Sequence, residues 1–124
     1  MLWAANTCAE ALVSIVFEFP DRQPVRVNVS IDEAAQLTGQ KLPYMIEFLT
    51  RAALLKAGLK YEVLETDGQR SITSIDSIPS DTQREWVCFV NGIRSPFHIN
   101  TQSTENVRSI RFVLESKGDR TQQP

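Results

Sequence analysis

The sequence predicts an α+β domain in which a mixed, twisted sheet of four to six strands packs on one principal helix. Segments 12–19 and 25–31 alternate apolar and polar residues, as antiparallel strands with one buried face do. Segment 42–57 carries apolar residues at three- and four-residue spacing, which is typical of an amphipathic helix. Alternation returns after residue 58, so the remaining elements are predicted to be strands. A chain of 124 residues has room for one domain of this kind.

The first two strands are predicted to form an antiparallel hairpin over residues 12–31. Their apolar faces consist of Val13, Ile15, Phe17 and Phe19 in the first strand and of Val25, Val27, Val29 and Ile31 in the second. The connection from Pro20 to Pro24 has turn chemistry, because proline presets φ and Asp21 can bond back to the backbone. Asp32 is expected to cap a single helical turn that ends at Thr38-Gly39.

The principal helix is expected to span residues 42–57. Its buried face is assigned to Leu42, Met45, Ile46, Leu49, Ala53 and Ala57. Pro43 lies near the first turn, where a missing N–H costs nothing, and Gly58 is a natural residue to end the helix. The opposite face, which we expect to be mostly exposed to solvent, carries Glu47, Thr50, Arg51 and Lys56.

The segment after the helix predicts a strand over 59–65 and a hairpin turn at Asp67-Gly68. The return segment is less regular, because Ile72, Ile75 and Ile78 recur every three residues, which fits neither a strand nor a helix. A last strand is predicted over 109–115. Its inward-facing residues are Ile110, Phe112 and Leu114.

A second hairpin, over residues 85–100, organises the C-terminal half of the chain. Trp86, Cys88 and Val90 alternate on one face of its first strand. Asn91-Gly92 then supplies the two φ > 0 residues of a type I′ turn. The return strand is predicted over 93–99, and Pro96 suits an edge position because it has no N–H to donate to a neighbouring strand.

The domain is predicted to occupy residues 12–116. Residues 1–11 are interpreted as an N-terminal lead-in, because they lack the basic start of a signal peptide. Residues 117–124 have no apolar side chain to bury and are expected to form a disordered tail. Neither end predicts a cellular compartment.

Composition and charge exclude several classes of protein. Thirteen basic and fifteen acidic residues give a net charge of -2 without a basic stripe, which argues against a nucleic-acid binder. Apolar runs are far shorter than the ~20 residues that span a bilayer. Cys8 and Cys88 are too widely separated for a CxxC motif. We expect a buried, inert thiol at Cys88, and a Cys8–Cys88 disulfide stays open.

The chain lacks the residue groups that catalysis requires. His98 is its one histidine, so a multi-histidine metal centre is excluded. Cys88 and His98 lie on opposite arms of the second hairpin, but no third group that would orient the histidine is evident. The five glycines are scattered and form no phosphate-binding loop. We therefore expect no enzymatic activity, no cofactor and no metal.

Hairpin, helix and further strands, in that order, are the layout of a β-grasp fold, in which a mixed sheet curls over one helix. A split βαβ arrangement is the alternative, and it requires a second helix that residues 66–107 do not predict. The run from Trp86 to Gly92 reads Trp-Val-Cys-Phe-Val-Asn-Gly, and an isoleucine-rich segment, Ile72 to Ile78, precedes it.

In these features the chain resembles the transcobalamin C-terminal-like β-grasp family. That family occurs in bacterial surface and secreted proteins and at the C-terminus of vitamin B12 carriers, and its function is largely unknown. The chain departs from the family pattern at Asp76-Ser77, where Asn-Gly is frequent, and at residues 105–108, where a Gly-Asp pair is usual.

The resemblance implies a non-catalytic binding or protein-interaction module that uses the Trp86–Asn100 hairpin region. The candidate contact residues are Trp86, Asn91, Gly92, Arg94, Phe97 and His98. A core role for Trp86 is the structural alternative, since tryptophan is usually well buried. The alternative function is a cobalamin-like small-molecule carrier subdomain whose site needs a second domain or subunit. An edge-strand homodimer stays open, and the sequence does not identify the protein partner or small molecule.

Overall fold

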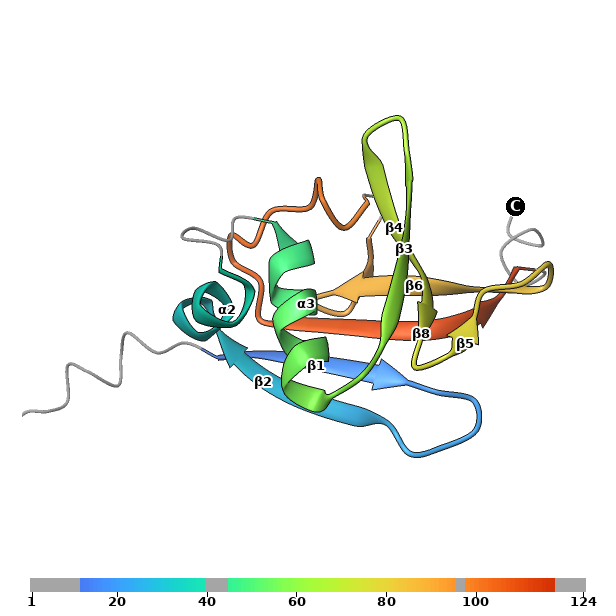
Figure 1. Cartoon of the computed structure of the whole chain (residues 1–124), viewed down its shortest axis with the longest axis horizontal. Helices are drawn as coiled ribbons and strands as arrows, with labels where there is room; N and C mark the ends of the chain where they lie inside the picture. The colour runs from blue at the N-terminus through green and yellow to red at the C-terminus, as the bar shows by residue number, and fades with distance from the viewer. Residues whose placement is uncertain (1–11, 40–44, 96–97, 118–124) are drawn as a thin grey trace, which may run out of the picture.

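A computed structural model describes residues 12–39, 45–95 and 98–117, in which two helices and two sheets confirm the α+β class (Figure 1). The first part of the chain contains β1 (Leu12–Glu18), β2 (Val25–Ser30), α2 (Ile31–Thr38) and α3 (Ile46–Ala57). The second part contains β3 (Tyr61–Thr66), β4 (Gln69–Ile75), β5 (Ile78–Pro79), β6 (Arg84–Val90), β7 (Ile93–Arg94) and β8 (Ser109–Ser116).

The larger sheet brings the first and last strands of the domain together. Its strand order is β2-β1-β8-β6-β7, and β1 runs parallel to β8 while the other neighbours are antiparallel. Phe17 pairs with Phe112 across β1 and β8, and their rings stack with centroids 5.7 Å apart. Both residues are buried, so the parallel pair lies at the centre of the core.

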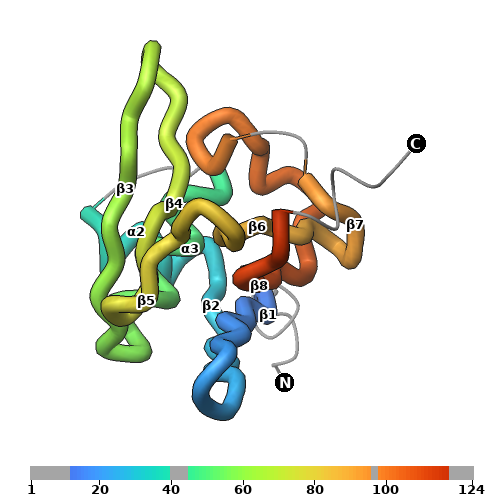
Figure 2. The backbone as a smooth tube through the Cα atoms, turned by 90° about the vertical axis from the view of Figure 1, so that its right-hand side faces the viewer, coloured from blue at the N-terminus to red at the C-terminus, as the bar shows by residue number. Residues whose placement is uncertain are grey.

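The smaller sheet has the order β3-β4-β5, and its β3–β4 hairpin projects beyond the rest of the molecule (Figures 1 and 2). The expected turn is confirmed, with φ of 55° at Asp67 and 81° at Gly68. A register shift between Glu62 and Val63 explains the three-residue isoleucine spacing on β4. At this shift β4 has one residue more than β3, which moves the inward–outward alternation of the β4 side chains by one position. Ile72 and Ile75 are therefore both buried.

Helix α2 is longer than the single turn expected after the first hairpin. It has eight residues, and the side chain of Ser30 caps it by accepting a hydrogen bond from the Glu33 N–H at 3.0 Å. The expected cap, Asp32, is instead the second residue of the helix. Ser30 and Glu33 have the spacing of a capping box, which is the signal in the sequence that would have predicted this helix. Its expected end at Gly39 is confirmed, with φ of 76°.

Helix α3 begins at Ile46, later than expected, while Leu42 and Pro43 lie outside the described residues. The N-cap residue Met45 is extended and makes no side-chain cap. The first amides are satisfied by a distant loop, since Ile46 donates to the Gln102 carbonyl at 2.9 Å and Glu47 to the Ile99 carbonyl at 3.0 Å.

The expectation that Glu47 and Thr50 face solvent is wrong. Their relative exposures are 6% and 1%. At Glu47 the reason is that Arg70 of the β3–β4 hairpin and the backbone of loop 98–103 contact a side of α3 that helical periodicity assigns to water. Ile46, Leu49 and Ala53 form part of the hydrophobic core, as expected, and the expected end at Gly58 is confirmed.

The return strand of the second hairpin is much shorter than expected. It has two residues, Ile93 and Arg94, and Pro96 and Phe97 lie outside the described residues. Ser95 donates its N–H to the Cys88 carbonyl at 2.9 Å. His98 already belongs to loop 98–103, whose carbonyls accept hydrogen bonds from the first amides of α3. The backbone of this loop pairs with α3 and β4, so it is not available to extend β7.

Lys117, the first residue of the predicted tail, donates its N–H to the Gln83 carbonyl at 2.8 Å. The predicted lead-in, residues 1–11, and the rest of the predicted tail, residues 118–124, lie outside the described residues. Within the part of the chain that the structure describes, neither helix has the length and apolar character needed to cross a membrane.

Candidate functional site

A small pocket lies where the two sheets meet, between β4 and β6. Its volume is about 110 Å³. Ile72, Trp86, Ile99 and Phe112 form most of its apolar lining. Its polar lining comes from Arg70, Ser71, Cys88, Ser95 and His98. The pocket therefore joins an apolar side to a group of polar side chains, which is the usual character of a small-molecule site, although known ligand pockets are generally larger.

The pocket lies beside a part of β6 that does not pair with the return strand of the second hairpin. Strand β7 pairs only with Phe89 and Val90, so the rest of the β6 edge is not covered by β7. Strand β4 of the smaller sheet faces this edge, and loop 98–103 places His98 and Ile99 over the gap. Residues from four separate segments are thus brought to one place.

Ser71 and His98 form the polar contact at the centre of this lining. The Ser71 hydroxyl lies 3.0 Å from Nδ1 of His98, and both side chains are half-buried. The histidine tautomer decides which of the two groups donates the hydrogen bond. His98 also lines the same pocket as Cys88, but the partner of its ring is a serine on β4.

Cys88 carries a free thiol at the pocket wall. Burial disfavours the thiolate and raises the pKa of Cys88 from 9.0 to about 12. At neutral pH the group is therefore a protonated, weak nucleophile. Cys8, the possible disulfide partner of Cys88, lies outside the described residues.

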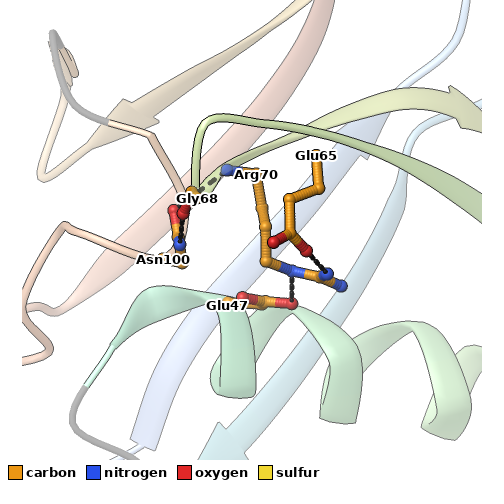
Figure 3. Close-up of polar contacts among 5 residues, drawn as sticks. All are labelled: Glu47, Glu65, Gly68, Arg70 and Asn100. Carbon is orange, nitrogen blue, oxygen red and sulfur yellow. Dashed lines mark hydrogen bonds and ion pairs between the residues drawn. The ribbon is translucent and has the colours of Figure 1, made fainter.

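Arg70 contributes the one charge among the side chains of the described residues that line the pocket, and that charge is already paired (Figure 3). Its Nε donates to the Glu47 carboxylate at 2.6 Å, and its Nη1 donates to Glu65 at 3.0 Å. The hydrogen bond that Arg70 donates to Glu47 is the main cause that raises the pKa of Arg70. Because two carboxylates hold the guanidinium, it is poorly placed to bind an anion in the pocket.

Asn100 links the same hairpin to loop 98–103 (Figure 3). Its side-chain oxygen accepts from the Arg70 N–H at 3.1 Å, and its amide nitrogen donates to the Gly68 carbonyl at 2.7 Å. Ile99 also donates its N–H to the Arg70 carbonyl at 3.3 Å. The loop that covers the pocket is therefore fixed to the β3–β4 hairpin at its turn end.

Two of the six predicted contact residues, Trp86 and His98, line the pocket. Trp86 is also a core residue, since it is 8% exposed, contacts the Phe19 ring edge-on at 5.8 Å and donates its indole N–H to the Ile78 carbonyl at 2.8 Å. The structural interpretation of Trp86 is thus confirmed, and only part of the side chain faces the pocket.

Asn91 and Gly92 form the expected type I′ turn, with φ of 53° and 83°. The Asn91 side-chain oxygen accepts from the N–H groups of Arg108 and Ser109, at 2.7 and 3.2 Å, and its amide donates to the Asn106 carbonyl at 2.9 Å. An open depression of about 440 Å³ borders these residues. The side-chain atoms of Asn91 already form hydrogen bonds within the protein. The observed role of Asn91 is therefore to link the hairpin turn to the residues that lead into β8.

Arg94 lies on the other face of the sheet from Trp86. It pairs in register with Phe89, and its guanidinium forms an ion pair with Glu115 on β8. Phe97 lies outside the described residues. The structure therefore brings Trp86 and His98 together at one site, and it separates Arg94 from both.

The part of the chain that the structure describes contains no cluster of side chains suited to bind a metal ion. No group of three or more His, Cys, Asp or Glu side chains comes together there. The pocket-lining residues of these types are Cys88 and His98. This set of residues does not fit a tetrahedral structural zinc site, which needs four protein ligands.

The fold is shared with solved structures at low sequence identity. A protein from Ruminococcus gnavus ATCC 29149, described as a "putative metal binding protein", aligns with 86% of this chain and 98% of its own, at 12% identity and a TM-score of 0.62. Haptocorrin in complex with Cbi aligns with 84% of this chain at 11% identity and a TM-score of 0.54. This chain spans 25% of haptocorrin. The likeness is one of fold, and it indicates a distant structural relationship.

Comparisons by sequence give no family. The sequence matches no protein-family model, and a search of curated proteins finds no match.

Sequence reasoning did not find Ser71, Arg70 or Glu47 as part of this region. Ser71 precedes the irregular isoleucine segment, and Glu47 has the position of an exposed helix residue. Their contacts join residues 23 and 27 positions apart, so no local spacing could have indicated them.

Proposed function

We propose that this chain is a non-catalytic binding module of the transcobalamin C-terminal-like β-grasp type. The fold assignment is supported by the β1–β2 hairpin, the following helix α3 and the parallel pairing of β1 with β8. The second sheet and helix α2 are then additions to that layout. The pocket between β4 and β6 is the binding site, and it takes part of its lining from the Trp86–Asn100 region that the sequence indicated and the rest from β4 and β8.

One observation carries the proposal: Trp86 and His98 line a pocket in which apolar surface and polar side chains converge. Catalysis is disfavoured because Cys88 is protonated at neutral pH and Ser71–His98 has no carboxylate among its hydrogen bonds in the described residues. A serine nucleophile needs a base beside it that a third group orients, and the described residues supply no such third group.

The proposal is tested by mapping where ligands bind. A library of small ligands is added to isotope-labelled protein, and amide shifts are followed by NMR. We expect hits to move the signals of Ser71, Cys88, His98 and the Trp86 indole. Hits that cluster elsewhere, or none at millimolar ligand, would contradict this site, and substrate turnover that depends on Cys88 or His98 would contradict the non-catalytic assignment.

A carrier subdomain is the second candidate, and the likeness to haptocorrin in complex with Cbi favours it. This chain would then supply one half of a cobalamin-like site, with the other half on a second domain or subunit. The test is to titrate Cbi and cobalamin against the same NMR signals. Shifts confined to one connected surface support the carrier, whereas an unchanged spectrum at saturating ligand favours the free-standing binding module.

A further inference from the structure

We propose that the pocket between β4 and β6 selects an uncharged ring that carries one hydrogen-bonding atom, such as a phenol. This inference rests on the proposed function and adds the chemical class of the ligand. The ring can come from a free small molecule or from a tyrosine side chain of a protein partner, and the experiment below separates these sources.

The size of the pocket limits the ligand. At about 110 Å³ it is somewhat smaller than the cavity of roughly 150 Å³ that holds a benzene molecule in an engineered protein. A single six-membered ring therefore fills it, with any further substituent projecting from the open side. A fused ring system or an extended peptide backbone is too large to enter.

The apolar lining favours a ring over a flexible chain. Trp86 and Phe112 supply aromatic surface, and Ile72 and Ile99 supply aliphatic surface. All four residues are at least nine-tenths buried, so their positions are set by the core before any ligand arrives. A rigid ring loses little conformational entropy on entering such a preformed site.

The charge of the lining disfavours ions. Among the described residues that border the pocket, Arg70 is the one charged side chain, and Glu47 and Glu65 together hold its guanidinium at 2.6 and 3.0 Å. The lining formed by residues 12–39, 45–95 and 98–117 contains no carboxylate, and Cys88 is a protonated thiol there. An anion would find no available cation and a cation no carboxylate, so either would lose its hydration without a counter-charge.

The polar residues of the lining can form the hydrogen bond with the polar atom of the ligand ring. Ser71 and His98 already share one hydrogen bond of 3.0 Å, and each side chain retains capacity for another. Ser95 is less available, because its hydroxyl donates to the Gln102 side chain at 3.0 Å. Ser71 and His98 are therefore the residues that distinguish a phenol from benzene.

The experiment compares four ligands of similar size on isotope-labelled full-length protein. Phenol, benzene, benzoate and benzylammonium are titrated separately, and the Trp86 indole N–H serves as the reporter. A Trp3→Phe variant assigns that signal, since the chain has two tryptophans. We expect phenol to bind with a Kd on the order of 1 mM, benzene about fivefold more weakly, and either ion at least about tenfold more weakly.

Two variants of Ser71 test the location. Ser71→Leu fills the pocket and is expected to abolish the phenol response, whereas Thr73→Leu, on the same strand but outside the lining, is expected to retain it. If Ser71→Leu fails to fold, Ser71→Ala serves instead: it removes the hydroxyl and is expected to reduce the phenol-to-benzene preference toward unity. Unchanged binding and preference in the folded Ser71 variants would overturn the assignment.

A neutral tyrosine derivative, N-acetyltyrosinamide, separates the two sources. Binding as tight as that of phenol indicates a side chain of a protein partner, and binding of phenol alone indicates a small molecule. If benzoate or benzylammonium instead binds this pocket more tightly than phenol, the ligand class is wrong while the proposed binding module stands. If none of the ligands moves signals at the pocket and the library screen is also negative there, the proposed function itself fails.

Discussion

Glu47 on α3 and Arg70 on β4 form an ion pair of 2.6 Å whose two halves differ in burial. The Glu47 side chain is 8% exposed and that of Arg70 is 33% exposed. Arg70 has a second acidic partner, Glu65, whereas the hydrogen bond from Arg70 is the one described for the Glu47 carboxylate. This contact joins the projecting β3–β4 hairpin to the helix (Figure 3).

The unequal burial predicts unequal effects on the free energy of unfolding. Arg70→Leu leaves a buried carboxylate unpaired and is expected to cost about 2–4 kcal/mol, whereas Glu47→Gln leaves an arginine that still contacts Glu65 and water and should cost about 1–2 kcal/mol. Glu65→Gln, in the exposed pair, is the control and should cost less than about 1 kcal/mol. Urea denaturation of the three variants measures the difference. Equal costs for Arg70→Leu and Glu65→Gln would show that the buried pair has no special role.

Gly92→Val is expected to lower the free energy of unfolding by about 1–3 kcal/mol, because a β-branched residue is strained at a φ of 83°. No atom lies within 4 Å of a Cβ added at Gly92, so the effect comes from the backbone alone. Gly92→Asn, which tolerates positive φ, is the matched control and should cost clearly less. A thermal melt in which both variants equal the parent would contradict the turn's contribution to stability.

Asn91 is expected to stabilise the domain through its side chain as well as through its φ of 53°. Asn91→Gly keeps the turn but removes three hydrogen bonds to residues 106–109, at a cost of about 1–2 kcal/mol given their exposure. Asn91→Asp keeps the accepting oxygen and should cost less. Hydrogen exchange of the Arg108 and Ser109 amides provides the local measurement, and protection unchanged in Asn91→Gly would contradict this role.

The raised pKa of Cys88 predicts that the free energy of unfolding falls at alkaline pH. Its pKa is raised by burial from 9.0 in an exposed thiol to about 12 in the folded protein. The unfolded chain therefore loses this proton first, and the contribution of Cys88 is fully present below pH 9 and disappears as the pH rises toward about 12. Comparing denaturation midpoints of Cys8→Ser with those of Cys8→Ser/Cys88→Ala isolates the effect. The single variant should fall more steeply above pH 9 than the double variant, and parallel pH profiles would contradict the assignment.

Short-range signals accounted for much of the fold. Alternation located β1, β2 and β8, and the pairs Asp67-Gly68 and Asn91-Gly92 located two turns. Helix α2 was underestimated although its capping-box signal is local, because Ile31 continued the alternation of β2. The length of β7 was overestimated, because the competing partners of loop 98–103 lie on α3 and β4.

The candidate site was only partly accessible to sequence reasoning. Trp86 and His98 were selected from the hairpin motif and do line the pocket. Ser71 could not be selected, since its contact with His98 depends on where loop 98–103 lies against β4. Arg94 was grouped with these residues by proximity along the chain, yet strand alternation across a sheet places it on the opposite face.

By itself, the sequence determined the α+β class, the two glycine-containing hairpin turns and the apolar faces that form the core. These features follow from backbone preferences and from periodicity, which act over a few residues. Only the tertiary structure decided that Glu47 is buried, that His98 contacts Ser71 and that a pocket separates β4 from β6. The first two outcomes depend on contacts between residues 23 and 27 positions apart, and the third depends on how separate strands pack, so packing and hydrogen-bond satisfaction outweigh local preference.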